Sequence, residues 1–421
     1  MKTKTWLWIV VAVLAAAGAA WWLWRPQTVT LNDGTKLKLV AVTYGKHHKF
    51  PGERYESSVS DSTNDTLYVW IEQRHKGNNY PNYSLWAYDQ SATACVGVFA
   101  RVFPRHSREN RRGDEMVGFQ LDAFPRRQGK FYLRIQEWSR QNGRQNMQPT
   151  IKNGFVISNP ARGRFPAWFP DPLPNTQEDG DLSVTLDRLE FGAKTRYTRN
   201  PKAPNDPMNK AVLAAFQIQQ NGKNATNWQP AQVETSDATG NHITGWCDSH
   251  WTNDEEVTLY QFGLWPDEPA WKLRFEFSRT SGFHNDELWT VQNVPVEPGR
   301  QQDLWNFGNR DQTNSAFAET TLNGIHLKLF PAKQFTDQPK RRGSIEGGLV
   351  VQTDLPLDGM RLTLIKAADE QGHEIKPMTM GWGGNDFWFG LQELGNARSL
   401  NLTLALHRSR FVEFTTKPAK P

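Results

Sequence analysis

Apolar and polar residues alternate in three stretches of the chain that open in similar ways. The stretches read VTLNDGTKLKLVAV from Val29, LSVTLDRLEFGAK from Leu182 and TTLNGIHLKLFPAK from Thr320. Successive side chains of a strand point to opposite faces, so alternation with one apolar face predicts a strand at the surface of a sandwich. The three stretches therefore predict the first strand of a module that is used three times.

Each opening is followed by a similar series of short apolar runs separated by polar turns. The copies close on NGFVISNP from Asn153, LWTVQNVPV from Leu288 and FVEFTTKP from Phe411. Five to seven short strands in each copy, with hardly any helical periodicity, predict β-sandwiches. The expected fold class is all-β, with three tandem β-sandwich domains of immunoglobulin-like type behind an N-terminal transmembrane helix.

Two connecting segments set the expected domain boundaries. Residues 159–181 hold five prolines, and proline cannot donate to a strand ladder and stiffens extended chain. A second, polar connection follows Pro295. The expected order is a first domain at 28–160, a Pro-rich linker at 161–180, a second domain at 181–297, a linker at 298–319 and a third domain at 320–417.

The N-terminal segment has a different composition. Residues 6–24, WLWIVVAVLAAAGAAWWLW, carry no charge and have tryptophans at both ends. Nineteen residues at ~1.5 Å rise span about 28 Å, close to the hydrocarbon core of a bilayer. A transmembrane signal-anchor at 6–24 with a cytoplasmic leader at 1–5 is expected, which makes this a single-pass membrane protein with its bulk periplasmic or extracytoplasmic. The alternative is a signal peptide cleaved near Ala17-Gly18-Ala19.

Composition is that of a folded chain with several domains. The chain has 421 residues, 38% hydrophobic and 22% charged, and its net charge of +5 does not require a nucleic-acid partner. Its two cysteines, Cys95 and Cys247, argue against a disulfide scaffold. They occupy equivalent places in two copies and are expected to be separate thiols.

The repeated pattern over about residues 28–417 resembles the immunoglobulin-like modules that follow a membrane anchor in many bacterial envelope proteins. The stretch LNDGTKLKLVAVTYGKHHKF, residues 31–50, also resembles a segment of membrane-anchored bacterial proteins. The resemblance implies tandem sandwich modules in the cell envelope. It implies no activity and no functional residues, and the Cys–Trp–Cys arrangement of immunoglobulin domains is absent.

Strong catalytic and metal-binding motifs are absent from the sequence. It has no G-x-S-x-G, no P-loop, no H-E-x-x-H and no C-x-x-C. The richest cluster, CDSHWTNDEE from Cys247, fits an exposed acidic turn or a zinc site that lacks a second Cys/His pair. GWGGND from Gly381 fits a turn. We therefore expect no catalytic residue, no metal and no cofactor.

Binding residues are expected where aromatic or basic side chains fall outside the strand pattern. Most tryptophans outside the anchor, such as Trp271, alternate as core residues. The candidates for an exposed binding surface are three rings in irregular segments and three arginines of a basic run: Trp168, Trp305, Trp382, Arg108, Arg111 and Arg112. The alternatives are a packing role for the three rings, with Trp305 docked on a neighbouring domain, and a solvated hairpin loop for the arginines.

The sequence thus predicts a non-enzymatic, membrane-tethered envelope protein whose modules serve interaction or spacing. The expected partners are the membrane, through the N-terminal helix, and an envelope polysaccharide or protein. The alternative is an envelope enzyme that acts on glycan or peptide in a crevice between domains, which would require convergent polar groups in an inter-domain pocket.

Overall fold

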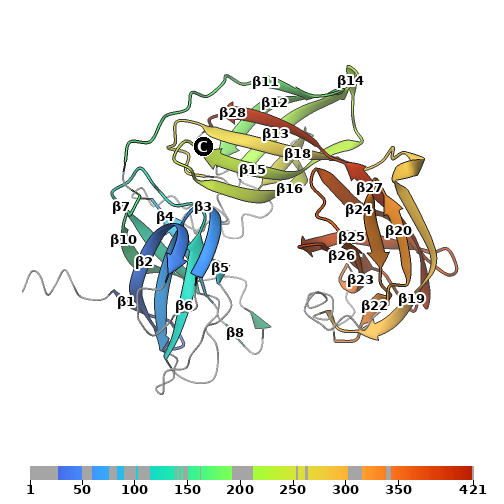
Figure 1. Cartoon of the computed structure of the whole chain (residues 1–421), viewed down its shortest axis with the longest axis horizontal. Helices are drawn as coiled ribbons and strands as arrows, with labels where there is room; N and C mark the ends of the chain where they lie inside the picture. Colours follow the sequence, from blue (N-terminus) through green and yellow to red (C-terminus); the bar gives the residue numbers. More distant parts are fainter. Residues whose placement is uncertain are drawn as a thin grey trace, which may run out of the picture.

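Strands make up most of the regular structure of the chain. The computed structural model describes residues 27–49, 59–74, 83–89, 101–102, 114–137, 140–141, 144–145, 150–161, 163–191, 212–252, 255–260, 264–301, 315–337 and 343–419. The strands form three lobes, which follow one another around an open arc in Figure 1. The three alternating openings are strands, as predicted: β2 (Lys36–Lys49), β12 (Leu182–Phe191) and β21 (Ile325–Leu329).

The first lobe consists of two sheets, of five and three strands. The order of the first is β1-β2-β3-β6-β5 and that of the second is β10-β7-β4, and every pairing is antiparallel. The remaining bounds are β1 (Thr28–Thr30), β3 (Val59–Arg74), β4 (Tyr83–Tyr88), β5 (Arg101–Val102), β6 (Asp114–Leu121), β7 (Lys130–Glu137) and β10 (Thr150–Ser158), with the short pair β8 (Arg140–Gln141) and β9 (Arg144–Gln145).

The second lobe is a nine-stranded sheet. Its order is β11-β12-β13-β17-β16-β15-β18-β28, with β14 paired to β13. Its strands, besides β12, are β11 (Asn175–Asp179), β13 (Val212–Gln220), β14 (Lys223–Asn224), β15 (Trp228–Asp237), β16 (His242–Thr252), β17 (Glu255–Tyr260), β18 (Trp271–Arg279) and β28 (Arg410–Thr416). The expected Pro-rich linker thus ends in a strand, because β11 pairs with β12.

The third lobe is a second nine-stranded sheet, of order β20-β21-β23-β22-β19-β27-β24-β25-β26. A further pairing of β23 with β26 closes seven of these strands into a ring. The bounds, besides β21, are β19 (Leu288–Gly299), β20 (Ala318–Leu322), β22 (Ala332–Phe335), β23 (Ile345–Thr353), β24 (Met360–Asp369), β25 (Glu374–Gly383), β26 (Asp386–Gln392) and β27 (Ser399–Arg408). A short 3-10 helix, η2 (Asn285–Glu287), precedes β19.

The second and third lobes exchange the strands that were expected to close them. The closing run of the second copy is β19, which pairs with β27 of the third lobe. The closing run of the third copy is β28, which pairs with β18 of the second lobe along seven residue pairs, from Trp271–Thr416 to Phe277–Arg410. Figure 1 shows β28 running back from the third lobe into the second. Each of the two sheets therefore includes one strand from the residues that were expected to form the other domain.

Buried apolar residues form two main cores. One continuous cluster runs through the first and second lobes and includes residues of β28, namely Val412 and Phe414. The third lobe has its own cluster, to which β19 contributes Trp289 and Val291. Trp271 is fully buried, as its alternation predicted. Each exchanged strand thus supplies apolar side chains to the lobe that receives it.

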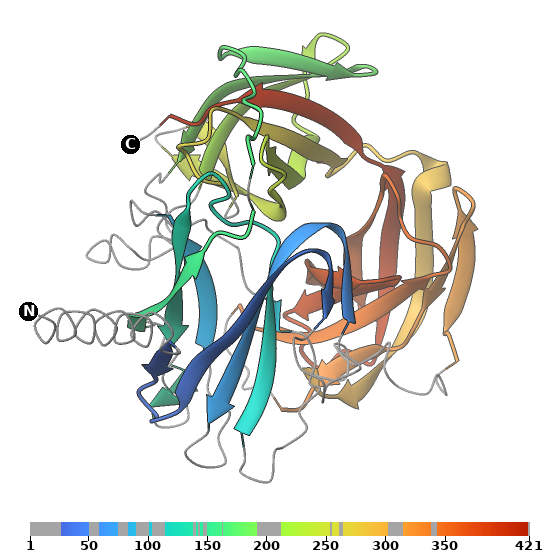
Figure 2. The ribbon, with the colours of Figure 1, turned by 60° about the vertical axis from the view of Figure 1, so that its left-hand side comes forward.

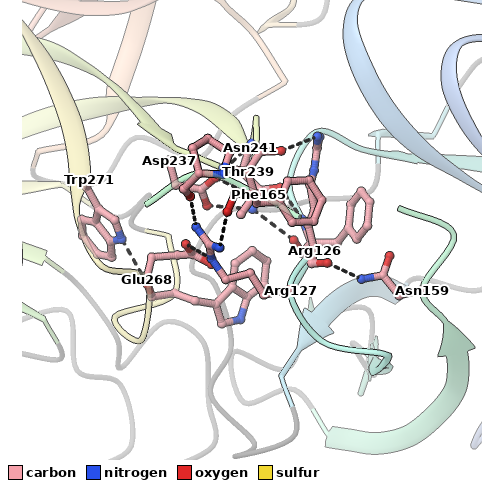
Figure 3. Close-up of polar contacts among 12 residues, drawn as sticks. Arg126, Arg127, Asn159, Phe165, Asp237, Thr239, Asn241, Glu268 and Trp271 are labelled. Atoms are coloured by element: carbon pink, nitrogen blue, oxygen red, sulfur yellow. Dashed lines mark hydrogen bonds and ion pairs between the residues drawn. The ribbon is translucent and has the colours of Figure 1, made fainter. Parts of the chain in front are cut away.

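A buried polar network joins the first lobe to the second (Figure 3). Arg126, only 3% exposed, donates to the carbonyl oxygens of Thr239 at 3.1 Å and Asp65 at 2.6 Å. The side chain of Asn241 accepts from the Phe124 amide and donates to the Phe124 carbonyl, both at 3.1 Å. Because burying an unpaired polar group costs free energy, these contacts fix the orientation of the two lobes relative to each other.

The neighbouring arginine fixes the segment between these lobes (Figure 3). Arg127 lies 2.8 Å from a carboxylate oxygen of Glu268 and donates to the carbonyl oxygens of Phe165 and Pro166. Burial raises the pKa of Glu268, and the ion pair with Arg127 acts in the opposite direction. Further along, the Asp171 amide donates to Thr415 of β28 at 2.7 Å. The Pro-rich segment is therefore attached to the second lobe.

The expected fold class is contradicted. The chain is built of strands, but a ring of seven strands and two lobes with exchanged strands replace the expected row of three immunoglobulin-like sandwiches. The physical reason is that alternation specifies the buried face of a strand and not its partner, so β19 and β28 fit either neighbouring sheet equally well by pattern.

The expected membrane anchor is also corrected. Among the residues that the structure describes, no helix combines the length and the apolar character needed to cross a membrane. A single-pass membrane protein held by an N-terminal helix is therefore not supported by the described part of the chain. The stretch at 6–24 on which that expectation was based lies outside the described residues.

We expect Asn241→Ala to destabilise the protein by about 2–4 kcal/mol. The truncation leaves the amide and carbonyl of Phe124 unpaired in a site where Asn241 is 1% exposed. Denaturant unfolding measures the change. Asn224→Ala on the exposed strand β14 is the matched control and should change stability by less than about 0.5 kcal/mol. Equal effects for the two variants would show that the network does not hold the lobes together.

Phe414→Ala should lower the free energy of unfolding by about 3–5 kcal/mol. The second lobe should lose protection against amide hydrogen exchange, although Phe414 lies in the expected third domain. Phe414 is fully buried, with its ring 6.3 Å from that of Phe275. Amide hydrogen exchange should accelerate more in β18 than in β27. Phe317→Ala, at a site 41% exposed, is the control. Faster exchange confined to β27 would contradict the observed pairing.

Candidate functional site

A groove of about 990 Å³ lies between the second and third lobes. The second lobe lines it with residues of β15, β16, β18 and β28, and the third lobe with residues 356–365, Phe387, Phe389 and two glycines of the β25–β26 hairpin. Figure 1 shows β25 and β26 pointing from the third lobe toward β16, and Figure 2 shows the same strands behind the first lobe. The groove is therefore an inter-domain pocket, lined by residues of both lobes.

The wall on the second lobe is the outer face of its sheet. Val233, Phe275 and Val412 point to the core, so their neighbours along each strand point outward. The strand register aligns one outward row from Trp246 to Gln232, Glu276 and Phe411. The row therefore has an aromatic ring at each end and two polar side chains between them.

A second outward row runs beside the first and carries opposite charges. Glu234 lies opposite Arg274, and Arg274 Nη1 is 3.4 Å from both carboxylate oxygens. The Arg274 guanidinium carbon also lies 4.2 Å from the centre of the Phe411 ring. The ion pair and the cation–π contact together orient Arg274 along the groove wall.

Glu276 is the polar centre of the groove, and groups from two directions contact it. Ser409, which links β27 to β28, donates its hydroxyl to Glu276 Oε1 at 2.6 Å. Arg361 of β24 approaches the same oxygen with Nε at 3.8 Å. The carboxylate thus ties the second lobe to the third and to the connection between their strands.

Arg361 is a largely buried cation on the wall of the third lobe. Burial lowers the pKa of Arg361, while Glu276 and Cys247 act in the opposite direction. A buried cation is stabilised mainly by a nearby negative group. The contact between Arg361 and Glu276 therefore links the two walls of the groove.

The edge of β24 forms part of the same wall. The Ser409 amide donates to the Gly359 carbonyl at 3.0 Å, which makes 359–409 a hydrogen-bonded pair. Bonded and non-bonded pairs alternate in an antiparallel ladder, so Arg361 and Thr363 bond to β27. The backbone groups of Leu362 and Leu364 consequently point away from β27, toward the groove side of the strand.

β25 does not pair with that edge of β24. Among the described strands, β24 and β25 pair only at Ala367–Ile375 and Ala368–Glu374, next to the turn that joins them. The next residue of β25 that faces β24 is Pro377, which has no N–H to donate. Beyond this point β25 pairs with β26 alone. The residue without a backbone N–H, Pro377, thus lies where the ring of seven strands opens toward the groove.

A neutral histidine lies behind the groove, where the chain crosses between lobes. His407 of β27 is fully buried, and its ring centre lies 5.0 Å from that of Phe283, which follows β18. Burial lowers the pKa of His407 to about 4 from its ordinary value of 6.5, and the positive charge of Arg279 adds to this effect. Arg279 itself pairs with Glu287 of η2. His407 is therefore neutral at neutral pH.

Most of the binding residues named from sequence lie outside this groove or outside the described chain. Trp168 is half-buried on the Pro-rich segment, with Lys272 Nζ 5.5 Å from its ring centre. Trp382 belongs to β25, not to an irregular segment, and its side chain lies outside the described part. GWGGND forms the β25–β26 turn, as predicted. The residues outside the described ranges are Trp305, Arg108, Arg111 and Arg112.

The groove residues themselves were missed. Glu276 and Arg361 are single charged residues in alternating strands, where the pattern indicates only an outward face. The one available signal was Pro377, because a proline inside an apolar run indicates a strand edge. Cys247 lies on the groove wall, whereas Cys95 is outside the described ranges. Within those ranges, no three His, Cys, Asp or Glu side chains gather as they would around a metal ion.

Stability should fall as the pH drops from about 6.5 toward 4, and His407 should account for about 2–3 kcal/mol of the loss. The native state keeps this ring neutral, with a pKa of about 4, while the unfolded chain binds a proton below 6.5. The stability is thus present above the unfolded pKa and lost below it. His407→Leu should flatten this part of the pH profile of unfolding, and the exposed control His284→Leu should not. Identical profiles for the two variants would contradict a buried neutral His407.

Comparison of the chain with protein-family models, with curated proteins and with solved structures finds no match.

Proposed function

We propose that this protein is a non-enzymatic binding protein that holds an extended segment of a partner polypeptide in the groove between its second and third lobes. The observation that carries the proposal is the open edge of β24, which directs backbone N–H and C=O groups into the groove. Backbone groups of this kind are matched by the backbone of another chain.

The groove has the size and the chemical character of a binding site. Its volume of about 990 Å³ is at the upper end of what small-molecule sites show and suits several residues of extended chain. Trp246 at its rim is 47% exposed, and large aromatic residues are common anchors at interfaces. The paired charges of Glu234, Arg274, Glu276 and Arg361 supply polar contacts.

The contacts of Glu276 favour binding over catalysis. Its carboxylate accepts a hydrogen bond from Ser409 and faces Arg361, so it acts as a positioned acceptor between the lobes. Activation of a serine nucleophile requires a base that takes up the hydroxyl proton, usually a histidine oriented by a third group. The Ser409 hydroxyl is instead engaged with a carboxylate that is itself next to a cation.

The groove walls are fixed in advance of binding, which favours affinity. The chain crosses between the two lobes before β19 and again before β28, and Ser409 at the second crossing contacts Glu276. A groove held in its binding geometry avoids the entropic cost of ordering its walls when the ligand arrives. The structure thus supports a preformed receptor for an extended ligand.

Trp246→Ala should weaken binding of a peptide ligand by on the order of 2 kcal/mol, about 30-fold, because it removes an exposed aromatic anchor. The probe is a set of peptides selected from a random twelve-residue display library on the immobilised full-length chain. Titration calorimetry measures affinity, and thermal melting should show a stability change below about 1 kcal/mol.

The matched control for this experiment is Phe169→Ala. Phe169 is 86% exposed on the Pro-rich segment and does not line the groove, so its loss should leave affinity unchanged. Selected peptides that bind Trp246→Ala as well as the wild type would refute the groove as the binding site. Binding of oligosaccharides alone, lost in Trp246→Ala, would show that the groove takes a glycan and not a polypeptide.

A further inference from the structure

We infer that the partner segment binds as an added β-strand along β24, in the position that β25 vacates at Pro377. This inference rests on the proposed function and specifies how the ligand is recognised. The partner is an extended polypeptide segment that supplies its own backbone N–H and C=O groups. The contact sites on this chain are the backbones of Leu362 and Leu364.

The first argument is that β24 has an open edge at these two residues. Leu362 is 4% exposed and Leu364 is 5% exposed because their side chains pack in the core of the third lobe, and no strand pairs with the other edge of β24 between Met360 and Lys366 in the described chain. The N–H and C=O groups along a strand edge without a partner can pair with the backbone of another chain. The edge of β24 that faces the groove is therefore a position at which a strand of another chain can pair.

The second argument is that the limits of the open edge are defined by the chain itself. On one side, a β-bulge lies between Leu364 and Lys366, and the β24–β25 ladder begins at Ala367. On the other side, the Met360 amide is turned back to the Leu357 carbonyl at 3.4 Å. The opening thus spans the two outward-facing residues between these limits, which suits a short strand.

The third argument concerns the side chains on the two faces of β24. Leu362 and Leu364 point into the core of the third lobe, whereas Arg361 reaches Glu276 on the second lobe. A strand added beside β24 must follow the same alternation. Its side chains would be apolar on the face toward Phe387 and Phe389, and polar on the face toward Arg361 and Glu276. The recognised sequence therefore alternates apolar and polar residues.

A panel of blocked seven-residue peptides tests this mode of binding with the full-length protein. The peptides carry valine, isoleucine or phenylalanine at alternate positions, with serine, lysine or glutamate between them. On binding, amide exchange at Leu362 and Leu364 should slow by at least about 10-fold, whereas Arg361 and Thr363, already bonded to β27, should change little. N-methylation of the central peptide residue that faces β24 should weaken binding by about 10-fold.

A variant of this chain provides the complementary test. Pro377→Ala restores an N–H on β25 at the point where its ladder with β24 stops. The ladder should then extend over the open edge, leave stability equal or higher, and reduce peptide affinity by at least about 10-fold. Pro356→Ala is the control, because Pro356 is an exposed residue of the groove loop outside both ladders.

The outcomes separate this inference from the proposed function. One outcome is peptide binding that depends on Trp246 and yet is insensitive to N-methylation and to Pro377→Ala, with no change in amide exchange at Leu362. That result would overturn strand addition and leave groove binding intact. Failure of every peptide to bind would overturn both. Binding that is sensitive to N-methylation and to Pro377→Ala, with slowed exchange at Leu362 and Leu364, would support strand addition.

Discussion

The exchange of strands between the second and third lobes is the constraint on which the groove depends. Because β28 belongs to the sheet of the second lobe and directly follows β27 of the third, the two lobes cannot separate without losing a core strand. Phe414 of β28 is buried in the core of the second lobe. His407 of β27 is buried against Phe283, where the chain passes between the lobes. The face bearing Glu276 and the edge bearing Leu362 are thereby held opposite each other. The geometry of the groove is a property of chain connectivity as much as of side-chain contacts.

Buried polar groups secure the other joint, between the first and second lobes. A continuous apolar cluster spans both lobes, but apolar contact alone is non-directional. Arg126 and Asn241 add direction, since Arg126 bonds to the Thr239 carbonyl and Asn241 to the backbone of Phe124 across the joint, and another arrangement would leave these groups unpaired. Arg127 holds the Pro-rich segment in a similar way, because it donates to the carbonyl oxygens of Phe165 and Pro166. The first lobe and the linker therefore form one unit with the second lobe.

The sequence predicted local structure well and long-range structure poorly, for a physical reason. Alternation correctly placed strands at the three repeated openings and identified Trp271 as a core residue, because both depend on neighbours along the chain. The partner of a strand depends on residues far away: β19 and β28 present similar apolar faces, and nothing local to Phe414 indicates which sheet receives it. The site was missed for the same reason. Glu276 and Arg361 are far apart in sequence and meet only because the strands are exchanged.

The open edge of β24 is maintained by features of the neighbouring strand and of β24 itself. Two features keep β25 from covering that edge: Pro377, which lacks the required N–H, and the β-bulge that follows Leu364. Protein edges are ordinarily protected by charge, by a bulge or by a covering segment. Here the sheet of the second lobe lies across the groove from the open edge of β24. It limits access to that edge by other protein molecules, while the groove leaves room for one inserted strand.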